Sequence, residues 1–196
     1  MIAGLLLAAG RSRRFGADKL CAKLDGKAVI RWSMAALSPL DSDSVYVVIA
    51  PGADAVTQAL SRLDVRFVVN LGRDEGMASS IRAGIAALPD DVAAVVIALA
   101  DQPRGSPAVT RALVDRWHVG DVAAVAPSYL DGRGHPVLFG RACFPALLAL
   151  RGDVGARGVL EELGDRAATV EVPAARPADV DTPEALAALQ QPRRDS

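Results

Sequence analysis

Apolar runs of strand length alternate along this chain with longer segments whose apolar positions recur at helical spacing. The apolar runs predict strands at residues 2–8, 44–50, 65–70, 93–99, 122–127, 136–139 and 167–172. The amphipathic segments predict helices at residues 29–38, 53–63, 77–88, 107–117, 141–150, 156–163 and 183–190. Strands that are apolar throughout are typical of a parallel sheet with helices on both faces. The pattern therefore predicts an α/β fold of three layers with a mainly parallel, Rossmann-like sheet.

The alternation is interrupted between residues 129 and 139, where Gly132, Gly134 and Pro136 fall close together. Because glycine and proline favour turns, we expect a small antiparallel excursion from the sheet there. A length of 196 residues suits one domain with a substantial core. We predict a single domain over residues 1–190 and a short, frayed polar tail over residues 191–196.

Composition and charge exclude several classes of protein. Apolar residues make up 51% of the chain but aromatic residues only 4%, which suits small side chains packed between helices and a sheet. The formal net charge of −1 gives no overall field that would attract nucleic acid or an anionic membrane. Cys21 and Cys143 are too few for a disulfide framework or a zinc site. The first apolar run is too short to cross a bilayer and lacks a secretory signal pattern, so we expect a cytoplasmic protein.

The loop after the first predicted strand holds the strongest candidate chemistry. Residues 10–19 read Gly-Arg-Ser-Arg-Arg-Phe-Gly-Ala-Asp-Lys, so backbone amides and cationic side chains lie together where a buried strand ends. This combination is typical of a triphosphate-binding loop. The spacing matches neither a Walker A loop nor the Gly-x-Gly-x-x-Gly fingerprint of dinucleotide-binding folds. An ordinary polar surface loop is the alternative that these residues alone leave open.

Two aspartates are candidates for metal binding. Asp101 lies shortly after the predicted strand 93–99, and Asp181 precedes the predicted helix 183–190. Together they offer two carboxylates to one hard cation, and Mg²⁺ is typically held by few protein oxygens, with water and phosphate completing its shell. Each aspartate taken alone also fits an ordinary turn or helix cap. Asp179 is the weaker candidate, because an extended segment places it further from the edge of the sheet.

The order Leu-x-Ala-Ala-Gly-x-Ser-x-Arg-x-Gly-x-x-Lys over residues 6–19 resembles the signature of the MobA-like nucleotidyltransferases, and within them of the molybdenum cofactor cytidylyltransferases. The resemblance implies a nucleotide-diphospho-sugar transferase-like fold. It also implies that Lys19 acts on the α-phosphate, that Arg14 contacts the β- and γ-phosphates, and that Asp101 and Asp181 hold Mg²⁺. Lys19, Arg14 and Asp101 are then the catalytic residues. The nucleotide-binding residues that the motif implies are Leu7, Ala8, Ala9, Gly10, Ser12, Arg14 and Lys19.

Two further segments resemble parts of the family pattern. Asn70, Gly76 and Ser79 match a segment near the base and sugar of the nucleotide, and the helix predicted after Gly76 offers free N–H groups to an anion. A serine acting only as a helix cap is the alternative there. Residues 134–136 match a Gly-His-Pro motif on the acceptor side, where a purely structural histidine is the alternative. The acceptor-binding residues implied are Ser80, Gly134, His135 and Pro136.

One residue departs from the family pattern. Lys23 stands where a proline is usual after the first lysine. The absence of proline leaves this segment less rigid, and the side chain of Lys23 is a further candidate for contacting phosphate.

The resemblance implies transfer of CMP from CTP to the terminal phosphate of molybdenum-loaded molybdopterin, with release of pyrophosphate. The choice of cytosine rests on Ala9, since guanylyl members usually carry glycine there and a methyl group leaves less room for a purine. A molybdenum cofactor guanylyltransferase that uses GTP is therefore the alternative. Two other classes are an NAD(P)-dependent oxidoreductase, which the missing fingerprint opposes, and a non-catalytic molybdopterin-binding chaperone. A recipient molybdoenzyme is implied as a transient partner, with no nucleic acid and no membrane.

Overall fold

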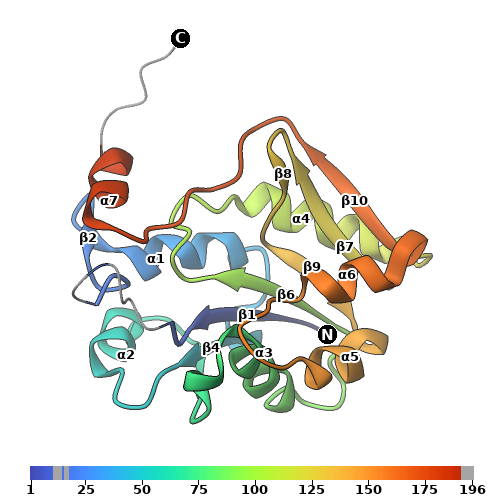
Figure 1. Ribbon diagram of the computed structural model, residues 1–196, viewed down its shortest axis with the longest axis horizontal. Coiled ribbons are helices and arrows are strands. Elements are labelled where there is room, and N and C mark those ends of the chain that lie inside the picture. Colours follow the sequence, from blue (N-terminus) through green and yellow to red (C-terminus); the bar gives the residue numbers. More distant parts are fainter. Residues whose placement is uncertain (11–14, 16–17, 191–196) are drawn as a thin grey trace.

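The computed structural model describes residues 1–10, 15 and 18–190, and contains a mixed sheet between two layers of helices (Figure 1). Seven strands follow the order β10-β7-β9-β6-β1-β4-β5, and β8 pairs with β7. The strands are β1 (Ile2–Ala8), β4 (Val45–Ile49), β5 (Arg66–Val69), β6 (Ala94–Leu99), β7 (Ala124–Tyr129), β8 (Gly132–Arg133), β9 (Val137–Gly140) and β10 (Ala167–Val172). The predicted three-layer α/β fold is confirmed.

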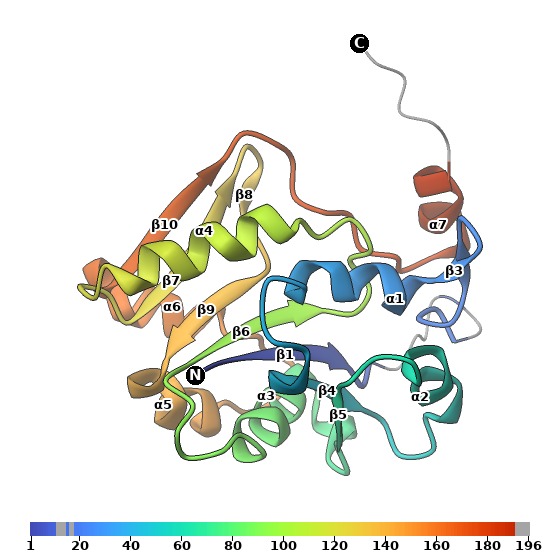
Figure 2. The same cartoon turned by 180° about the vertical axis from the view of Figure 1, so that it is seen from behind.

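Helices cover both faces of the sheet, as Figures 1 and 2 show from opposite sides. Alternate residues of β1 supply the two cores, because successive side chains of a strand point to opposite faces. Ala3 and Leu5 pack with one set of helices, and Leu6 and Ala8 pack with the other. The first set is α3 (Met77–Ala86), α5 (Phe144–Ala149) and α6 (Arg157–Leu163). The second set is α1 (Val29–Ser33), α2 (Asp54–Leu60) and α4 (Pro107–His118).

The central strand β1 sets the position of the candidate site. It pairs in parallel with β4 on one side and with β6 on the other, and Leu7 lies opposite both Val48 and Leu99. The three strands therefore end at the same edge of the sheet. This edge is where ligands bind in open α/β sheets.

The antiparallel part of the sheet lies deeper than the sequence predicts. Instead of forming an excursion at its margin, β9 lies between β6 and β7 and runs antiparallel to both, with Leu138 opposite Val96 and Val125. All residues of β9 are buried. A strand with no exposed face gains most by pairing on both sides, because its N–H and C=O groups are shielded from water.

Several predicted boundaries shift by a few residues. The predicted helix 29–38 is α1 followed by a 3₁₀ turn at Met34–Leu37. The predicted helix 141–150 begins with a 3₁₀ turn at Arg141–Cys143, and α5 begins beside Pro145, which suits a first turn because it lacks an N–H. The predicted strand 122–127 is displaced to β7, because Ser128 and Tyr129 pair with β8.

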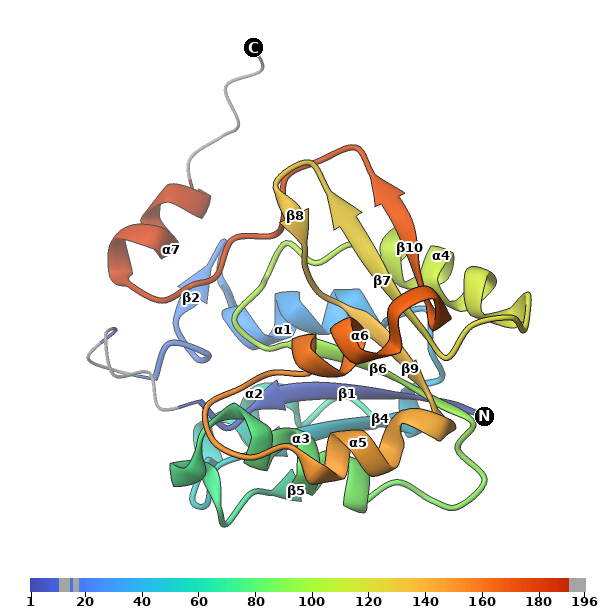
Figure 3. The same ribbon diagram turned by 45° about the vertical axis from the view of Figure 1, so that its right-hand side comes forward.

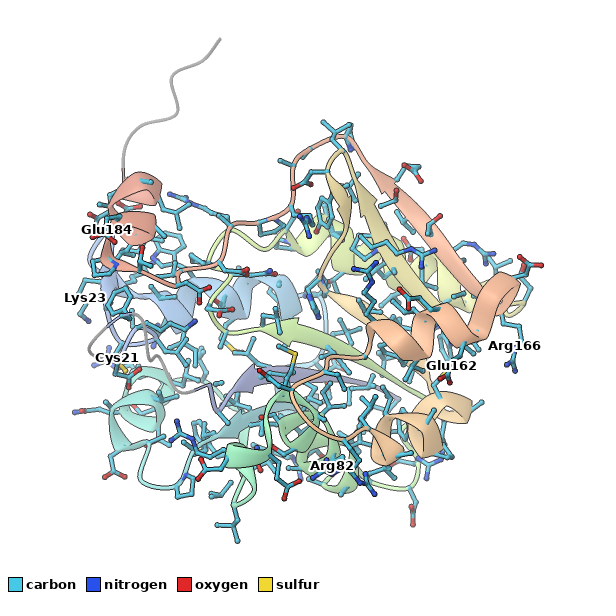
Figure 4. The ribbon with its side chains drawn as sticks, viewed as in Figure 1. Cys21, Lys23, Arg82, Glu162, Arg166 and Glu184 are labelled. Atoms are coloured by element: carbon cyan, nitrogen blue, oxygen red, sulfur yellow. The ribbon has the colours of Figure 1, made fainter. Side chains whose placement is uncertain are left out.

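The C-terminal helix α7 (Pro183–Gln190) lies apart from the two helix layers (Figure 3). It packs with the small sheet of β2 (Lys23–Leu24) and β3 (Lys27–Ala28) through a cluster around the fully buried Leu24, Val29 and Val180. Lys23 of β2 and Glu184 of α7 lie at the same end of the molecule (Figure 4). The predicted tail 191–196 lies outside the described residues. In the described part of the chain, no helix is long and apolar enough to cross a membrane.

Candidate active site

A cleft of about 480 Å³ opens where β1 and β6 end. One side is formed by residues that follow these two strands and by Lys19, and the other by the connection from β5 to α3. Its lining residues are Leu7, Ala9, Gly10, Lys19, Arg73, Asp74, Glu75, Gly76, Met77, Ser80, Leu99, Asp101, Asp153 and Asp181. The cleft therefore brings together residues from distant parts of the sequence that were predicted as phosphate-binding and metal-binding.

Lys19 lies between the two candidate metal ligands. Its Nζ donates to Oδ2 of Asp101 at 2.7 Å and to Oδ1 of Asp181 at 2.8 Å. Lys19 is only 8% exposed. Burial lowers the pKa of Lys19, but its hydrogen bonds and charge interactions with the two aspartates outweigh burial, so the pKa lies above its ordinary value. The ammonium group therefore stays protonated in the cleft.

The backbone places Asp181 beside Asp101. Val180 N–H donates to the carbonyl oxygen of Asp101 at 2.8 Å, and the Val180 side chain is fully buried. Asp179 instead accepts a hydrogen bond from Gln102 Nε2 at 2.8 Å through its Oδ1. Asp179 and Asp181 thus have different side-chain partners, and it is Asp181 that contacts Lys19 at the cleft.

The carboxylates of Asp101 and Asp181 fit a divalent cation. Both have an oxygen within hydrogen-bond distance of Lys19 Nζ, so the two carboxylates lie next to each other and offer hard oxygen ligands beside the ammonium group. Within the described ranges, no group of three or more His, Cys, Asp or Glu residues could hold a metal ion. Water and the phosphates of a ligand would therefore have to complete the coordination shell.

The opposite wall contains a cluster of neutral hydrogen bonds around Asn70, although charged residues of the same wall, among them Arg73 and Glu75, also line the cleft. Asn70 Nδ2 donates to the hydroxyl oxygens of Ser79 at 2.9 Å and Ser80 at 3.0 Å, while its Oδ1 accepts from Gly72 N–H at 3.0 Å. The Ser79 hydroxyl donates to the Gly76 carbonyl oxygen at 2.7 Å. Asn70 and Ser79 are buried within the wall, and Ser80 lines the cleft. Asn70 and Ser79 therefore hold the shape of a wall whose surface includes Gly76 and Ser80.

The start of α3 is not free to bind an anion, in contrast to the expectation from sequence. Met77 N–H already donates to Oδ1 of Asp153 at 3.1 Å. Gly76 permits this contact, because its φ is +95° and a Cβ at this position would lie 2.5 Å from the Cα of Asp153. The segment around Asp153 thus packs directly against the helix start and forms part of the cleft.

Of the four residues predicted for the acceptor side, Ser80 lies in α3 and lines the cleft, and the other three lie between β8 and β9. Gly134, His135 and Pro136 are not among the residues that line the cleft. Tyr129 Oη donates to the carbonyl oxygen of His135 at 2.8 Å, and a Cβ at Gly134 would lie 2.9 Å from Cε2 of Tyr129. Burial lowers the pKa of His135 to about 4, against the opposing charge of Asp101. His135 is therefore neutral near pH 7.

The comparison with known families decides the class of the protein. Residues 4–167 match the profile of the MobA-like NTP transferase domain. The chain belongs to the MobA-like NTP transferase family. It is a nucleotidyltransferase, and the expected membership of this family is confirmed. The alternative of an NAD(P)-dependent oxidoreductase is thereby excluded.

Relatives of this MobA-like transferase carry different names. It is 32% identical to the purine catabolism protein PucB of Bacillus subtilis, over 92% of each chain. It is also 37% identical to a probable molybdenum cofactor guanylyltransferase of Haloferax mediterranei, over 48% of this chain and 45% of the relative. Of these two relatives, the one named for molybdenum cofactor matches the shorter part of the chain.

Solved structures agree with the fold. Rv0371c of Mycobacterium tuberculosis superimposes with a TM-score of 0.85 at 28% identity, covering 96% of this chain and 97% of that protein. A complex of Rv0371c with manganese superimposes with a TM-score of 0.79 at 27% identity and the same coverage. The structural likeness extends over nearly the whole of the MobA-like chain.

Some residues of the family motif lie outside the described part of the chain. Conversely, some residues that line the cleft were not predicted from any sequence motif. Ser12 and Arg14 lie outside the described residues, and Lys23 is exposed and does not line the cleft. Arg73 Nη2 donates to the carbonyl oxygen of Gly10 at 3.4 Å, so it contacts the start of the loop that the sequence predicts to bind phosphate. Arg73 follows the end of β5, and this position could have suggested a role in ligand binding. No sequence signal points to Asp153, because it reaches the cleft by folding back from a distant loop.

Proposed function

We propose that this nucleotidyltransferase transfers CMP from CTP to the terminal phosphate of molybdopterin that carries molybdenum, and releases pyrophosphate. The observation that carries the proposal is the position of Lys19 between Asp101 and Asp181, where β1 and β6 end. This arrangement places a fixed positive charge and a pair of carboxylates at the edge of the sheet where a triphosphate would bind.

Lys19 is assigned to the α-phosphate. Attack on phosphorus increases the negative charge that the non-bridging oxygens must carry, and a positioned ammonium group stabilises this charge. Asp101 and Asp181 raise the pKa of Lys19 against the effect of burial, which keeps the group protonated for this role. No covalent intermediate on the enzyme is required, because positioning and charge stabilisation suffice for phosphoryl chemistry.

Asp101 and Asp181 are assigned as the ligands of Mg²⁺. When bound, the cation supplies charge neutralisation on the phosphates. The complex of Rv0371c with manganese supports a divalent cation in this fold. We assign the rest of the nucleotide to backbone groups of Gly10 and to the side chains of Ser12 and Arg14. The cleft surface near Gly76, which Asn70 and Ser79 hold in shape, is assigned to the nucleotide as well.

The remaining sites are assigned by the family pattern. The acceptor phosphate is assigned to the side of Ser80, Gly134, His135 and Pro136. A recipient molybdoenzyme would meet the product transiently. Ala9 supports CTP over GTP, because its buried side chain lines the cleft and a methyl group there reduces the room for a purine. The similarity to a probable molybdenum cofactor guanylyltransferase keeps GTP as the alternative nucleotide.

Product identification tests this proposal. The protein is incubated with Mg²⁺, molybdenum-loaded molybdopterin and each of the four NTPs, and the products are analysed by mass spectrometry together with pyrophosphate release. We expect the cytosine dinucleotide of the cofactor with CTP. A guanine dinucleotide would retain the mechanism and overturn the assignment of the base. Nucleotide binding without pyrophosphate release from any NTP would overturn transfer to molybdopterin and favour the chaperone alternative.

A further inference from the structure

Asp181 reaches the cleft from a segment without regular secondary structure. Residues 173–182 join β10 to α7 and cross from one side of the molecule to the other (Figure 3). Neither a helix nor a strand therefore fixes the side chain of Asp181. Its position relative to Asp101 depends on the contacts that residues 179–181 make with the end of β6.

Two hydrogen bonds join this segment to the residues after β6. Val180 N–H donates to the carbonyl oxygen of Asp101 at 2.8 Å, and Gln102 Nε2 donates to Oδ1 of Asp179 at 2.8 Å. The first bond uses only backbone atoms. The second joins side chains that immediately flank this backbone contact, one residue after Asp101 and two residues before Asp181.

The amide of Gln102 is chemically suited to this place. The carboxylate of Asp179 lies near those of Asp101 and Asp181, and like charges at close range repel. An ionised carboxylate only accepts hydrogen bonds, whereas the NH₂ group of glutamine donates them. Gln102 thus holds Asp179 without adding charge, and the Lys19 ammonium group remains paired with Asp101 and Asp181.

We propose that Gln102 is a positioning residue, which holds Asp179 and thereby sets Asp181 beside Asp101 so that both carboxylates bind one divalent cation. The inference rests on the proposed function, since it concerns the metal site assigned there. The far end of the same segment has its own attachment, where Arg176 N–H and Nε donate to Asp131 at 2.8 and 3.2 Å. Gln102 therefore acts on the part of the segment next to Asp181.

The test measures cation binding without turnover. Mn²⁺ is titrated into the wild-type protein and the Gln102→Met variant and followed by electron paramagnetic resonance, first alone and then with α,β-methylene analogues of CTP and GTP. Methionine matches the length of glutamine and removes the donor. We expect the Kd for Mn²⁺ to rise about fivefold, the effect of losing one hydrogen bond, while the melting temperature stays close to that of the wild type.

A reversed pair separates positioning from charge. The double variant Gln102→Glu, Asp179→Asn keeps the net charge and exchanges donor and acceptor, so we expect it to restore Mn²⁺ affinity to within about twofold of the wild type. Asp179→Asn alone leaves an acceptor oxygen for Gln102 and should weaken binding less than Gln102→Met. Gln58→Met, the same change on an exposed position of α2, serves as the matched control. In turnover assays, Gln102→Met should raise the KM for Mg²⁺ while kcat at saturating Mg²⁺ changes little.

The outcomes distinguish the inference from the proposed function. Unchanged Mn²⁺ affinity in Gln102→Met, beside clear binding by the wild type, overturns the role of Gln102 and leaves the metal site intact. Weakening in Asp179→Asn that equals or exceeds that in Gln102→Met, without recovery in the reversed pair, shows a charge effect and also overturns it. A wild-type protein that binds no Mn²⁺ under any of these conditions overturns the metal site itself, and with it the positioning role.

Discussion

The two walls of the cleft are built from different kinds of interaction. The charged edge is formed by Lys19, Asp101 and Asp181. Lys19 is separated from Asp101 by 82 positions in the sequence and from Asp181 by 162 positions, and the side chains remain partly exposed. The neutral wall, formed by Asn70, Ser79 and Ser80, joins residues within ten positions of one another and is buried. The charged edge carries charge to a place open to a ligand, whereas the side chains of Asn70, Ser79 and Ser80 bond to one another.

This difference indicates which wall carries out chemistry and which provides shape. Three charged groups at one partly exposed point cost free energy unless they are paired. These groups pair with one another in the absence of a ligand. A triphosphate and a cation together carry charges of both signs, so they can replace this mutual pairing. The hydrogen bonds of the neutral wall are complete without a ligand, so their loss should affect folding first. The following predictions test this division.

The largest effect is expected at the charged edge. Lys19→Met removes the ammonium group assigned to the α-phosphate, so kcat for nucleotidyl transfer should fall about 10²–10³-fold, as when one donor to a developing anion is removed. Steady-state pyrophosphate release measures this fall. Lys23→Met is the matched control, because Lys23 is exposed and does not line the cleft. Equal losses in the two variants would contradict the special role of Lys19.

A stability effect should dominate at the neutral wall. Asn70→Ala leaves Gly72 N–H without its acceptor and removes the donor to Ser79 and Ser80, so the free energy of unfolding should fall by about 2–3 kcal/mol. Urea denaturation measures this change. The loss of kcat per folded molecule should be far smaller than in Lys19→Met. A variant with normal stability and a large loss of kcat would place Asn70 with the charged edge instead.

A stability effect is also expected at His135, which we assign to the acceptor side, when pH falls. Because burial lowers the pKa of His135 from 6.5 to about 4, the unfolded chain binds a proton between these values while the native protein does not. Stability is therefore lost as pH falls from 6.5 towards 4. Relative to His135→Gln, the wild type should lose about 2 kcal/mol more between pH 7 and pH 4.5. Parallel stability curves for the two proteins would contradict a neutral His135.

The smallest effect is expected at Ala9, to which we assign the choice of base. Ala9→Gly removes a buried methyl group that lines the cleft, so relative kcat/KM should shift from CTP towards GTP by about tenfold. Competition between the two nucleotides, with product analysis by mass spectrometry, measures the shift. An unchanged ratio would show that Ala9 does not select the base.

The sequence predicts the extents of the strands better than it predicts which strands lie next to each other in the sheet. The apolar run at residues 2–8 matches β1 exactly in extent, because strand periodicity is a local property. The position of β9 between β6 and β7 depends on pairing between distant segments, so no local pattern reveals it. The excursion predicted at residues 129–139 therefore has the right antiparallel character but the wrong depth in the sheet.

The candidate site shows the same limit. The motif and the strand ends predicted Lys19, Asp101 and Asp181, and the fold brings their side chains into contact. Asp153 carried no signal, because it acts through one contact with Met77 N–H that depends on the path of a loop. A rule based on strand ends finds charged residues at the edge of a sheet. It does not find residues that fold over that edge from elsewhere.

The most direct test of the account is single-turnover pyrophosphate release by the wild type and by Asp101→Ala, with CTP, Mg²⁺ and molybdenum-loaded molybdopterin. The account predicts stoichiometric release by the wild type and a rate at least about 10²-fold lower in the variant, because one of the two ligands of the cation is lost. Full-rate release by a correctly folded Asp101→Ala protein would contradict the assignment of chemistry to the charged edge.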